Sequence, residues 1–272
     1  MLDQEQLHKK VKDILYKLTG ISLADNKDIM IVNRLEKLVR NTNFKGDINL
    51  LLNKIEQNNE FVTEFINTFT TNKTHFFREE FHFEDLKNRV LPNKKNINIY
   101  CCAASTGEEP YSIAMTVKEV SRTIKANIIA TDIDTNVLQY AANGIYRYQK
   151  SAKEFPSWIK PQKYFKKRTK KNLSTNEVLI KVNDDLKDML TFGQMNLNDT
   201  VYPFENEQFD VIFCRNVLIY FSLEDQNTIL KKLFSHLKIG GTMYIGHSES
   251  PQDLLHYTEK LGQNIFVKIR NI

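Results

Sequence analysis

The sequence predicts an α/β protein in which an all-helical N-terminal domain precedes a domain built on a doubly wound, mostly parallel sheet. Residues 1–72 contain amphipathic helical patterns and no strand pattern. In residues 73–272, short apolar runs alternate with helical patterns, which is typical of a parallel sheet covered by helices on both faces. The alternation is interrupted at about residues 145–196, where we expect a small antiparallel β insertion.

Two long amphipathic helices are predicted near the N-terminus. In "QEQLHKKVKDILYKLTG" the apolar residues recur on one helical face, and Gly20 provides a stop. "DIMIVNRLEKLVR" repeats the pattern, and "LLNKIEQ" and "NEFVTEFINTF" supply further amphipathic turns. The second helix also carries basic residues at spacing i, i+3, i+6, which we call the N-terminal basic stripe: Arg34, Lys37 and Arg40.

The strands of the second domain are predicted from short runs rich in β-branched and aromatic residues. Four of them read "INIYCC", "ANIIATD", "FDVIFC" and "TMYIGH", and the first three are each followed by a helical pattern. "NIFVKI" is expected to add a last, antiparallel strand at an edge of the sheet. Within the insertion, "KYFKKRT", "EVLIKV" and "MLTFGQM" are expected to form the antiparallel strands.

Composition excludes several classes of protein. Hydrophobic residues make up 41% of the chain and charged residues 26%, which is ordinary for a soluble globular protein. The chain has no apolar run long enough to span a membrane and no signal-peptide core, so we expect a cytoplasmic protein. Its 3 cysteines cannot form a disulfide framework, and its 6 histidines show no metal-ligand spacing with them. We expect no metal site.

Positive charge is concentrated in one part of the chain. Residues 144–182 hold eleven Lys or Arg and two acids, although the whole chain has a net charge of only +5. This basic segment either keeps a solvated loop soluble or forms a docking surface for an acidic partner. The sequence leaves both interpretations open.

A turn with one glycine follows the first predicted strand. "CCAASTGEEPYS" carries only Gly107, whereas a dinucleotide-binding loop uses several glycines to bring backbone N–H groups to a pyrophosphate. Asp132 ends the second strand, where an acid can accept hydrogen bonds from ribose hydroxyls, and Asp134 is expected to cap the next helix. A ribose acid without a phosphate loop favours S-adenosylmethionine over NAD.

Two further segments place polar residues beside aromatic ones where the sheet begins or where a strand ends. They are "TTNKTHFFRE" (residues 70–79) and "FCRNVLIYF" (213–221). The carboxyl ends of strands in open α/β sheets are where ligands bind, so both segments are candidates for a binding site. Taken singly, each can instead be structural, as a helix cap or as an arginine–carboxylate pair.

Taken together, the strings "TTNKTHFFRE", "AASTGEEPYSIA", "ATDIDTNVL", "FCRNVLIYF" and "GHSE" occur in this order in one family. From about residue 10 to the last strand, the chain resembles the CheR-type chemotaxis methyltransferases. Those enzymes transfer a methyl group from S-adenosylmethionine to glutamate side chains of bacterial chemoreceptors, leaving S-adenosylhomocysteine. The resemblance implies a Rossmann-like methyltransferase domain with a β-subdomain insertion, preceded by a helical domain that docks the receptor.

The resemblance also implies roles for single residues. It implies cofactor contacts for Asn72, Thr74, Arg78, Asp132, Asn196, Leu197, Asn216 and Val217. One acid of the pair Glu108 and Glu109 would meet the methionine amino group, with Glu109 preferred and the register open by one residue. Arg78 and Tyr220 are the implied catalytic residues, although each can instead be structural. Cys101 and Cys102 are expected to serve packing.

A carboxylate substrate needs no general base, because it is already ionised near neutral pH. This agrees with a sequence that shows no catalytic histidine pair and no nucleophilic cysteine motif. Arg78 is expected to steer the substrate carboxylate, since a guanidinium offers a bidentate fork, and Tyr220 to orient the methyl group or the carboxylate. Most of the acceleration should come from alignment and from removal of water.

Two alternatives remain. An RNA or DNA methyltransferase would use the basic segment to bind phosphates, but the usual base-methylating strings are missing. A non-catalytic regulator would keep the fold without the chemistry, yet the family positions hold the expected residue types. We expect chemoreceptors as partners, with no nucleic acid and no membrane insertion. Whether the insertion grips a receptor C-terminal tail, as in some members of the family, stays open.

Overall fold

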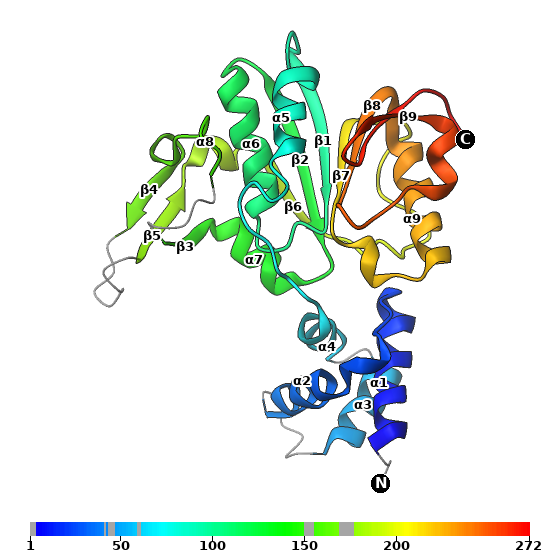
Figure 1. Ribbon diagram of the computed structural model, residues 1–272. Helices are drawn as coiled ribbons and strands as arrows, with labels where there is room; N and C mark the ends of the chain where they lie inside the picture. Colours follow the sequence, from blue (N-terminus) through cyan, green and yellow to red (C-terminus); the bar gives the residue numbers. More distant parts are fainter. Residues whose placement is uncertain (1–3, 41, 43–46, 59–60, 150–154, 169–176) are drawn as a thin grey trace.

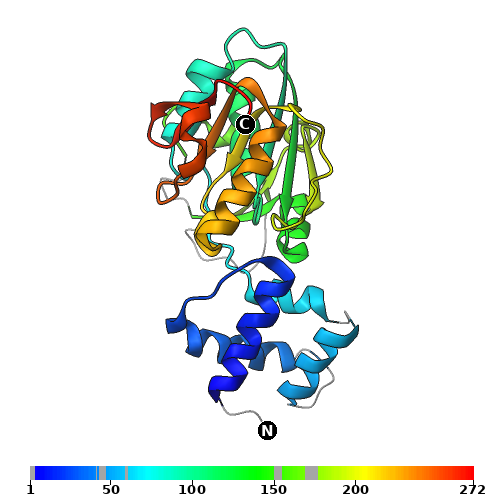
Figure 2. The same cartoon turned by 90° about the vertical axis from the view of Figure 1, so that its right-hand side faces the viewer.

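The computed structural model describes residues 4–40, 42, 47–58, 61–149, 155–168 and 177–272 (Figure 1). A cluster of short helices from the N-terminal part lies at one end of the molecule, and an α/β domain lies at the other. The view at 90° shows the same separation, with the first helix pointing toward the α/β domain (Figure 2). The predicted fold class is confirmed.

The N-terminal part consists of helices that pack through their apolar faces. They are α1 (Gln4–Thr19), α2 (Asp28–Arg40), α3 (Ile48–Asn58) and α4 (Val62–Phe69), with one 3-10 turn at Asp25–Lys27. Val11, Leu35, Leu51 and Phe65 contribute one residue from each helix to the core and are fully buried. Apolar residues that recur every three or four positions place one apolar stripe on each helix, and these stripes are buried against one another.

The α/β domain is built on a seven-stranded sheet in the order β6-β2-β1-β7-β8-β10-β9. The pairs from β6 to β8 are parallel, and β10 and β9 are added antiparallel at the other end. The strands are β1 (Asn96–Cys102), β2 (Lys125–Asp132), β6 (Leu190–Gln194), β7 (Phe209–Cys214), β8 (Leu237–Ile245), β9 (Thr258–Gly262) and β10 (Ile265–Lys268).

Helices cover both faces of this sheet, as expected for a doubly wound fold. One face packs against α5 (Phe81–Asp85), the π-helical turn Leu86–Val90 and α6 (Glu108–Val120). The other packs against α9 (Leu223–His236), while α7 (Thr135–Asn143) follows β2 and contacts β6. Because strand side chains alternate, Cys101 enters the first core and its neighbour Cys102 the second.

The insertion contains a three-stranded antiparallel sheet in the order β3-β5-β4, followed by the short helix α8 (Asp184–Lys187). The strands are β3 (Ile145–Gln149), β4 (Phe165–Arg168) and β5 (Glu177–Val182). Part of the prediction was wrong, because the run "MLTFGQM" forms β6, which pairs parallel with β2 at the edge of the main sheet. A half-buried edge strand gives a weak hydrophobic pattern, so its partner could not be identified from local sequence.

The C-terminal end of the sheet also differs from the prediction. β10 is antiparallel, as expected, but it pairs with β8 on one side and with β9 on the other, so β9 is the edge strand. β9 reads "TEKLG" and was missed because a solvent-exposed edge strand needs no apolar run. In the part of the chain that the structure describes, no helix has the length and apolar character needed to cross a membrane.

Candidate active site

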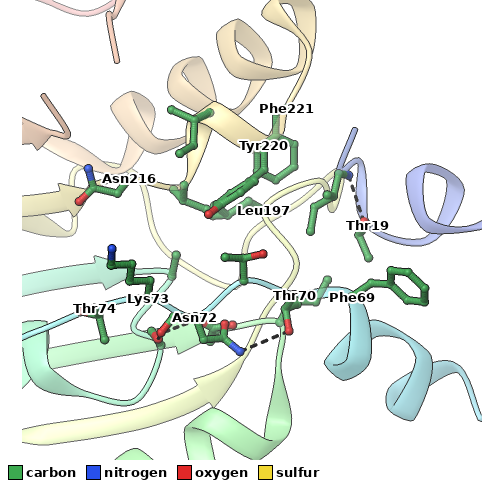
Figure 3. A pocket seen from close by; sticks show the side chains of 18 of the residues that line it. Thr19, Phe69, Thr70, Asn72, Lys73, Thr74, Leu197, Asn216, Tyr220 and Phe221 are labelled. Atoms are coloured by element: carbon green, nitrogen blue, oxygen red, sulfur yellow. Dashed lines mark hydrogen bonds between the residues drawn. The ribbon is translucent and has the colours of Figure 1, made fainter. Parts of the chain in front are cut away.

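A cavity of about 360 Å³ lies between the sheet and the helical domain, at the carboxyl ends of β1, β2, β6 and β7. Figure 3 shows Tyr220 on one side of it, Asn72 on the other, and Thr19 entering from the helical domain. Its size falls within the range of small-molecule sites. The predicted site residues that line it are Asn72, Thr74, Arg78, Glu109, Asp132, Asn196, Leu197, Asn216, Val217 and Tyr220.

Asp132 ends β2 and is 93% buried at the cavity wall. One carboxylate oxygen accepts the backbone N–H of Ser105 at 2.8 Å, and the other accepts that of Asp134 at 3.0 Å. Burial raises the pKa of Asp132, while the backbone hydrogen bonds act in the opposite direction. The carboxylate is therefore fixed in place, with lone pairs left over for hydroxyl groups of a ligand.

Asp134 caps α7, as predicted, since its side chain accepts the backbone N–H groups of Asn136 and Val137. The same carboxylate also accepts hydrogen bonds from Thr70 Oγ1 at 2.6 Å and from Asn72 Nδ2 at 2.8 Å. Asp134 thus ties the segment that leaves the helical domain to the end of β2. The Asn72 amide lines the cavity while its nitrogen is directed at Asp134.

Gly107 serves packing within the fold rather than close approach to a ligand. It caps α6 with φ +98°, and an added Cβ would lie 2.7 Å from Ala141 Cβ and 2.8 Å from the Tyr146 hydroxyl. The turn meets the cavity instead through Ala103 and Ser105, which have φ values of 56° and 50°. Helix α7 and strand β3 occupy the side on which a Cβ would stand, and Gly107 does not line the cavity.

The two acids that begin α6 point in different directions. Glu109 lines the cavity, whereas the carboxylate of Glu108 accepts a hydrogen bond from Thr106 Oγ1 at 2.6 Å and is not among the lining residues. Burial raises the pKa of Glu109, and Arg215 acts in the opposite direction. The geometry thus favours Glu109, the preferred member of the pair, for contact with a cationic group of a ligand.

Arg215, which leaves β7, is a buried cation, and its surroundings match the structural arginine–carboxylate pair that the sequence offered as one interpretation. Its side chain has no exposed area, and Nε lies 3.4 Å from Glu109 Oε2 while Nη2 lies 3.7 Å from Glu79 Oε2. Nη2 also donates to the backbone carbonyl of Arg78. Among the described residues, Nε and Nη1 have no hydrogen-bond partner. The buried charge of this guanidinium is therefore balanced mainly by the carboxylates of Glu79 and Glu109.

The segment from Asn216 to Tyr220 is held by a carboxylate that the sequence analysis did not assign. Glu249, in the "GHSE" string, accepts the backbone N–H groups of Asn216 at 2.9 Å and of Leu218 at 2.7 Å. Glu79 accepts the Asn216 side-chain amide at 3.1 Å. These bonds fix the 3-10 turn Leu218–Tyr220, so that Tyr220 faces the cavity.

Arg78 lies at the cavity, and the turn that carries it is unusual. Its Nη1 donates to the carbonyl of Lys73 at 3.1 Å, and the flanking Phe77 and Glu79 have φ values of 53° and 57°. Left-handed backbone at residues other than glycine is sparse and often occurs at functional sites. The rings of Phe76 and Phe77 anchor this turn in the core.

The helical domain closes the cavity, which the sequence did not predict. Several of its residues line the cavity, among them Thr19, Ile21, Leu23 and Met30. The backbone N–H of Ser22 donates to the Tyr220 carbonyl at 2.8 Å, and Asn196 Nδ2 donates to the carbonyl of Leu18 at 2.9 Å. Hydrophobic periodicity in a sequence identifies the buried face of a helix or strand, but it does not indicate which distant segments contact each other.

The N-terminal basic stripe is less uniform than its spacing suggested. Lys37 and Arg40 are exposed, whereas Arg34 is half-buried and its Nη1 donates to the carbonyl of Thr70 at 3.1 Å. Burial lowers the pKa of Arg34, and the nearby Tyr220 acts in the opposite direction. Arg34 therefore lies at the junction of the two domains. None of the three lines the cavity.

The described residues contain no group of three or more His, Cys, Asp or Glu side chains arranged to hold a metal ion. Of the basic segment, residues 150–154 and 169–176 lie outside the described residues. Within the described part, Lys166 and Lys167 are exposed on β4, and Lys166 Nζ lies 3.6 Å from Asp184 Oδ2.

Two family models together match most of the chain. One described as "CheR methyltransferase, all-alpha domain" matches residues 8–70, and one described as "CheR methyltransferase, SAM binding domain" matches residues 72–267. The chain belongs to the CheR methyltransferase family. The predicted resemblance is confirmed, and S-adenosylmethionine is the cofactor of this methyltransferase.

Several curated proteins that are similar to this chain are named chemotaxis protein methyltransferases. The CheR methyltransferase described here is 36% identical over 263 residues to the chemotaxis protein methyltransferase of Escherichia coli (strain K12), across 95% of this chain and 89% of that protein. It is 36% identical over 264 residues to that of Borreliella burgdorferi, across 92% and 89%. Against chemotaxis protein methyltransferase 2 of Pseudomonas aeruginosa the identity is 34% over 263 residues, across 95% and 91%.

The cavity of this CheR-family chain fits S-adenosylmethionine on its own chemistry. The cofactor carries an ammonium group, two ribose hydroxyls and an adenine ring. Glu109 offers a carboxylate that burial destabilises and a cation would restabilise, and Asp132 offers fixed acceptors at a strand end. Leu197 and Val217 add apolar surface to the same cavity.

Proposed function

We propose that this methyltransferase converts glutamate side chains of bacterial chemoreceptors into methyl esters. The observation that carries the proposal is the cavity itself, which joins the carboxylates of Asp132 at a strand end and Glu109 at a helix start to a cation and a phenol, Arg78 and Tyr220. The relatives described above are named chemotaxis protein methyltransferases, which supports chemoreceptors as the substrates.

The cofactor is held by residues that follow the strand ends, including Glu109 in the first turn of α6. Glu109 accepts the ammonium of the methionine part, and Asp132 accepts the ribose hydroxyls. Asn196 and Leu197 flank the adenine, while Asn72, Thr74, Asn216 and Val217 complete the walls. When bound, S-adenosylmethionine supplies a methyl group on a positively charged sulfur, and S-adenosylhomocysteine is the product.

The chain itself has little chemistry to perform beyond positioning. A glutamate carboxylate is ionised at neutral pH, so no residue has to remove a proton from it. The Arg78 guanidinium steers that carboxylate toward the methyl group, and the Tyr220 hydroxyl fixes its approach. Charge is neutralised as the transfer proceeds, so exclusion of water favours the reaction. The helical domain, which covers the cavity through Ile21 and Met30, supplies that exclusion.

The two domains have different roles in this proposal. Residues 1–72 dock the receptor and also close the cofactor site, and residues 73–272 carry the remaining cofactor contacts and the insertion. Docking of a glutamate-bearing receptor helix runs through the N-terminal basic stripe, with Lys37 and Arg40 as its exposed members. The insertion offers a second basic surface on β4, to which a receptor C-terminal tail can bind. The reaction takes place on the cytoplasmic part of the receptor.

The test is transfer of a labelled methyl group from S-adenosylmethionine to receptor-rich membranes and, separately, to total RNA. We expect label in receptor bands, released as volatile methanol by mild alkali because methyl esters hydrolyse under those conditions. Alkali-stable label in RNA would instead support a nucleic-acid methyltransferase. Binding of S-adenosylhomocysteine without transfer to either substrate would support a regulator that lacks catalysis.

A further inference from the structure

Glu109 is held from two sides by side chains of the sheet. Cys101 Sγ, near the end of β1, donates to Glu109 Oε1 at 3.3 Å, and Arg215 Nε lies 3.4 Å from Glu109 Oε2. The Glu109 side chain retains 13% of its surface exposed, and the residue lines the cavity. Each oxygen thus has one partner from within the protein.

The neighbouring cysteine points to the opposite face of the sheet. Cys101 and Cys102 are both fully buried, but Cys102 belongs to the core beneath α9, and its Sγ donates to the carbonyl of Phe213 at 3.0 Å. Two thiols of equal burial therefore stand next to each other in the chain. Of the two, the Cys101 thiol is the one that donates a hydrogen bond to a residue of the cavity wall.

We propose that Cys101 is a positioning residue, whose thiol donates to Glu109 and, together with Arg215, keeps that carboxylate turned toward the cofactor ammonium. This goes beyond packing, the role expected for the cysteine from sequence. The proposal rests on the proposed role of Glu109 in cofactor binding.

The contact between Cys101 and Glu109 affects the ionisation of Glu109. Burial raises the pKa of the Cys101 thiol well above its usual range, so the group remains a protonated donor. Burial also raises the pKa of Glu109, with Glu79 acting in the same direction, whereas Arg215, the Cys101 thiol and Arg78 lower it. Loss of the thiol removes one of the contacts that favour the ionised carboxylate.

The ionisation of Glu109 determines how the affinity for the cofactor depends on pH. The ammonium binds ionised Glu109, so affinity falls as the pH drops through the pKa of this residue. In Cys101→Ala that pKa is higher still, and the fall in affinity begins at a higher pH than in the wild type. Serine restores an O–H donor at the same position and should restore most of the affinity.

The experiment is titration calorimetry of S-adenosylhomocysteine with the full chain between pH 5.5 and 8.5. Cys101→Ala should weaken binding about fivefold near neutral pH, since a weak donor to a charged acceptor contributes roughly this much. Cys102→Ala is the matched control, because it deletes the same atom from an equally buried site and should leave affinity and its pH profile unchanged. Unfolding in denaturant checks that both variants are folded.

A double-mutant cycle with Glu109→Gln separates this proposal from the assignment of the site. Glu109→Gln should weaken binding by itself, and Cys101→Ala added to it should have no further effect. If Glu109→Gln weakens binding while Cys101→Ala matches Cys102→Ala, the role of Cys101 is refuted and the site assignment stands. If Glu109→Gln leaves affinity unchanged, both are refuted.

Discussion

Replacing Asp132 by asparagine should weaken the binding of S-adenosylhomocysteine by about 2 kcal/mol, or roughly 30-fold. The residue is proposed to accept two ribose hydroxyls, and a hydrogen bond to a charged acceptor exceeds one to a neutral acceptor by about 1 kcal/mol. Asparagine keeps the shape of the side chain and one acceptor oxygen. Its NH2 group would face one of the two backbone N–H groups that the Asp132 carboxylate accepts, from Ser105 or from Asp134. Unfolding in denaturant must therefore accompany the affinity measurement.

Alanine at the same position is a less clean test. The Asp132 carboxylate accepts backbone N–H groups from Ser105 at 2.8 Å and from Asp134 at 3.0 Å, both at buried sites. Asp132→Ala leaves these donors without a partner, at a cost of about 1–3 kcal/mol of folding free energy for each. Its affinity loss, about 1.5–3 kcal/mol from the two ribose bonds, would be measured on a destabilised protein.

Titration calorimetry measures the effect, with Asp210→Asn as the matched control. Asp210 lies near the start of β7, and its carboxylate accepts the backbone N–H of Asn98 at 2.9 Å, so it is also an acid that supports the sheet. It does not line the cavity. Equal affinity of Asp132→Asn and Asp210→Asn would show that Asp132 does not bind the ribose.

Three further outcomes are expected. Tyr220→Phe should lower kcat with the affinity for S-adenosylhomocysteine retained, and a kcat equal to that of the wild type would exclude a role for the hydroxyl. The double variant Lys37→Ala and Arg40→Ala should raise the KM for receptor at low salt and have a smaller effect at high salt, because exposed charges act mainly on the rate of encounter. The comparison is reversal to Glu of the basic β4 residues Lys166, Lys167 and Arg168. If only this second variant impairs receptor methylation, docking runs through the insertion. Burial lowers the pKa of His82 from 6.5 to about 4, so between these pH values the unfolded chain binds a proton that the native chain does not, and stability falls as the pH drops. The loss should reach about 3 kcal/mol in denaturant unfolding and be absent in His82→Gln.

Local sequence predicted those parts of the site that follow directly from a strand or a helix. Asp132 and Asp134 were identifiable because an acid after a buried apolar run marks a strand end and a helix cap. For the acid that meets the cofactor ammonium, the family resemblance left the pair Glu108 and Glu109, with Glu109 preferred; the two side chains point about 100° apart on a helix, so only one can face the cavity. The structure separates the pair, because Thr106 engages Glu108 and leaves Glu109 to the cavity.

The rest of the site depends on contacts between segments that are far apart in the chain. Arg215 meets Glu79 and Glu109 across more than a hundred residues, and Glu249 holds a turn that starts at Asn216. No periodicity encodes such pairs. The strands β6 and β9 were misplaced or missed for a related reason, because an edge strand buries too little surface to leave an apolar pattern.

Arg34 shows how the two domains are joined at the point where the chemistry is proposed. Its guanidinium donates to the carbonyl of Thr70, while the Thr70 hydroxyl donates to Asp134 at the end of β2. Three residues further on, the carbonyl of Lys73 accepts from Arg78. One short segment therefore connects α2, the strand end beside the proposed ribose acid and the proposed catalytic arginine.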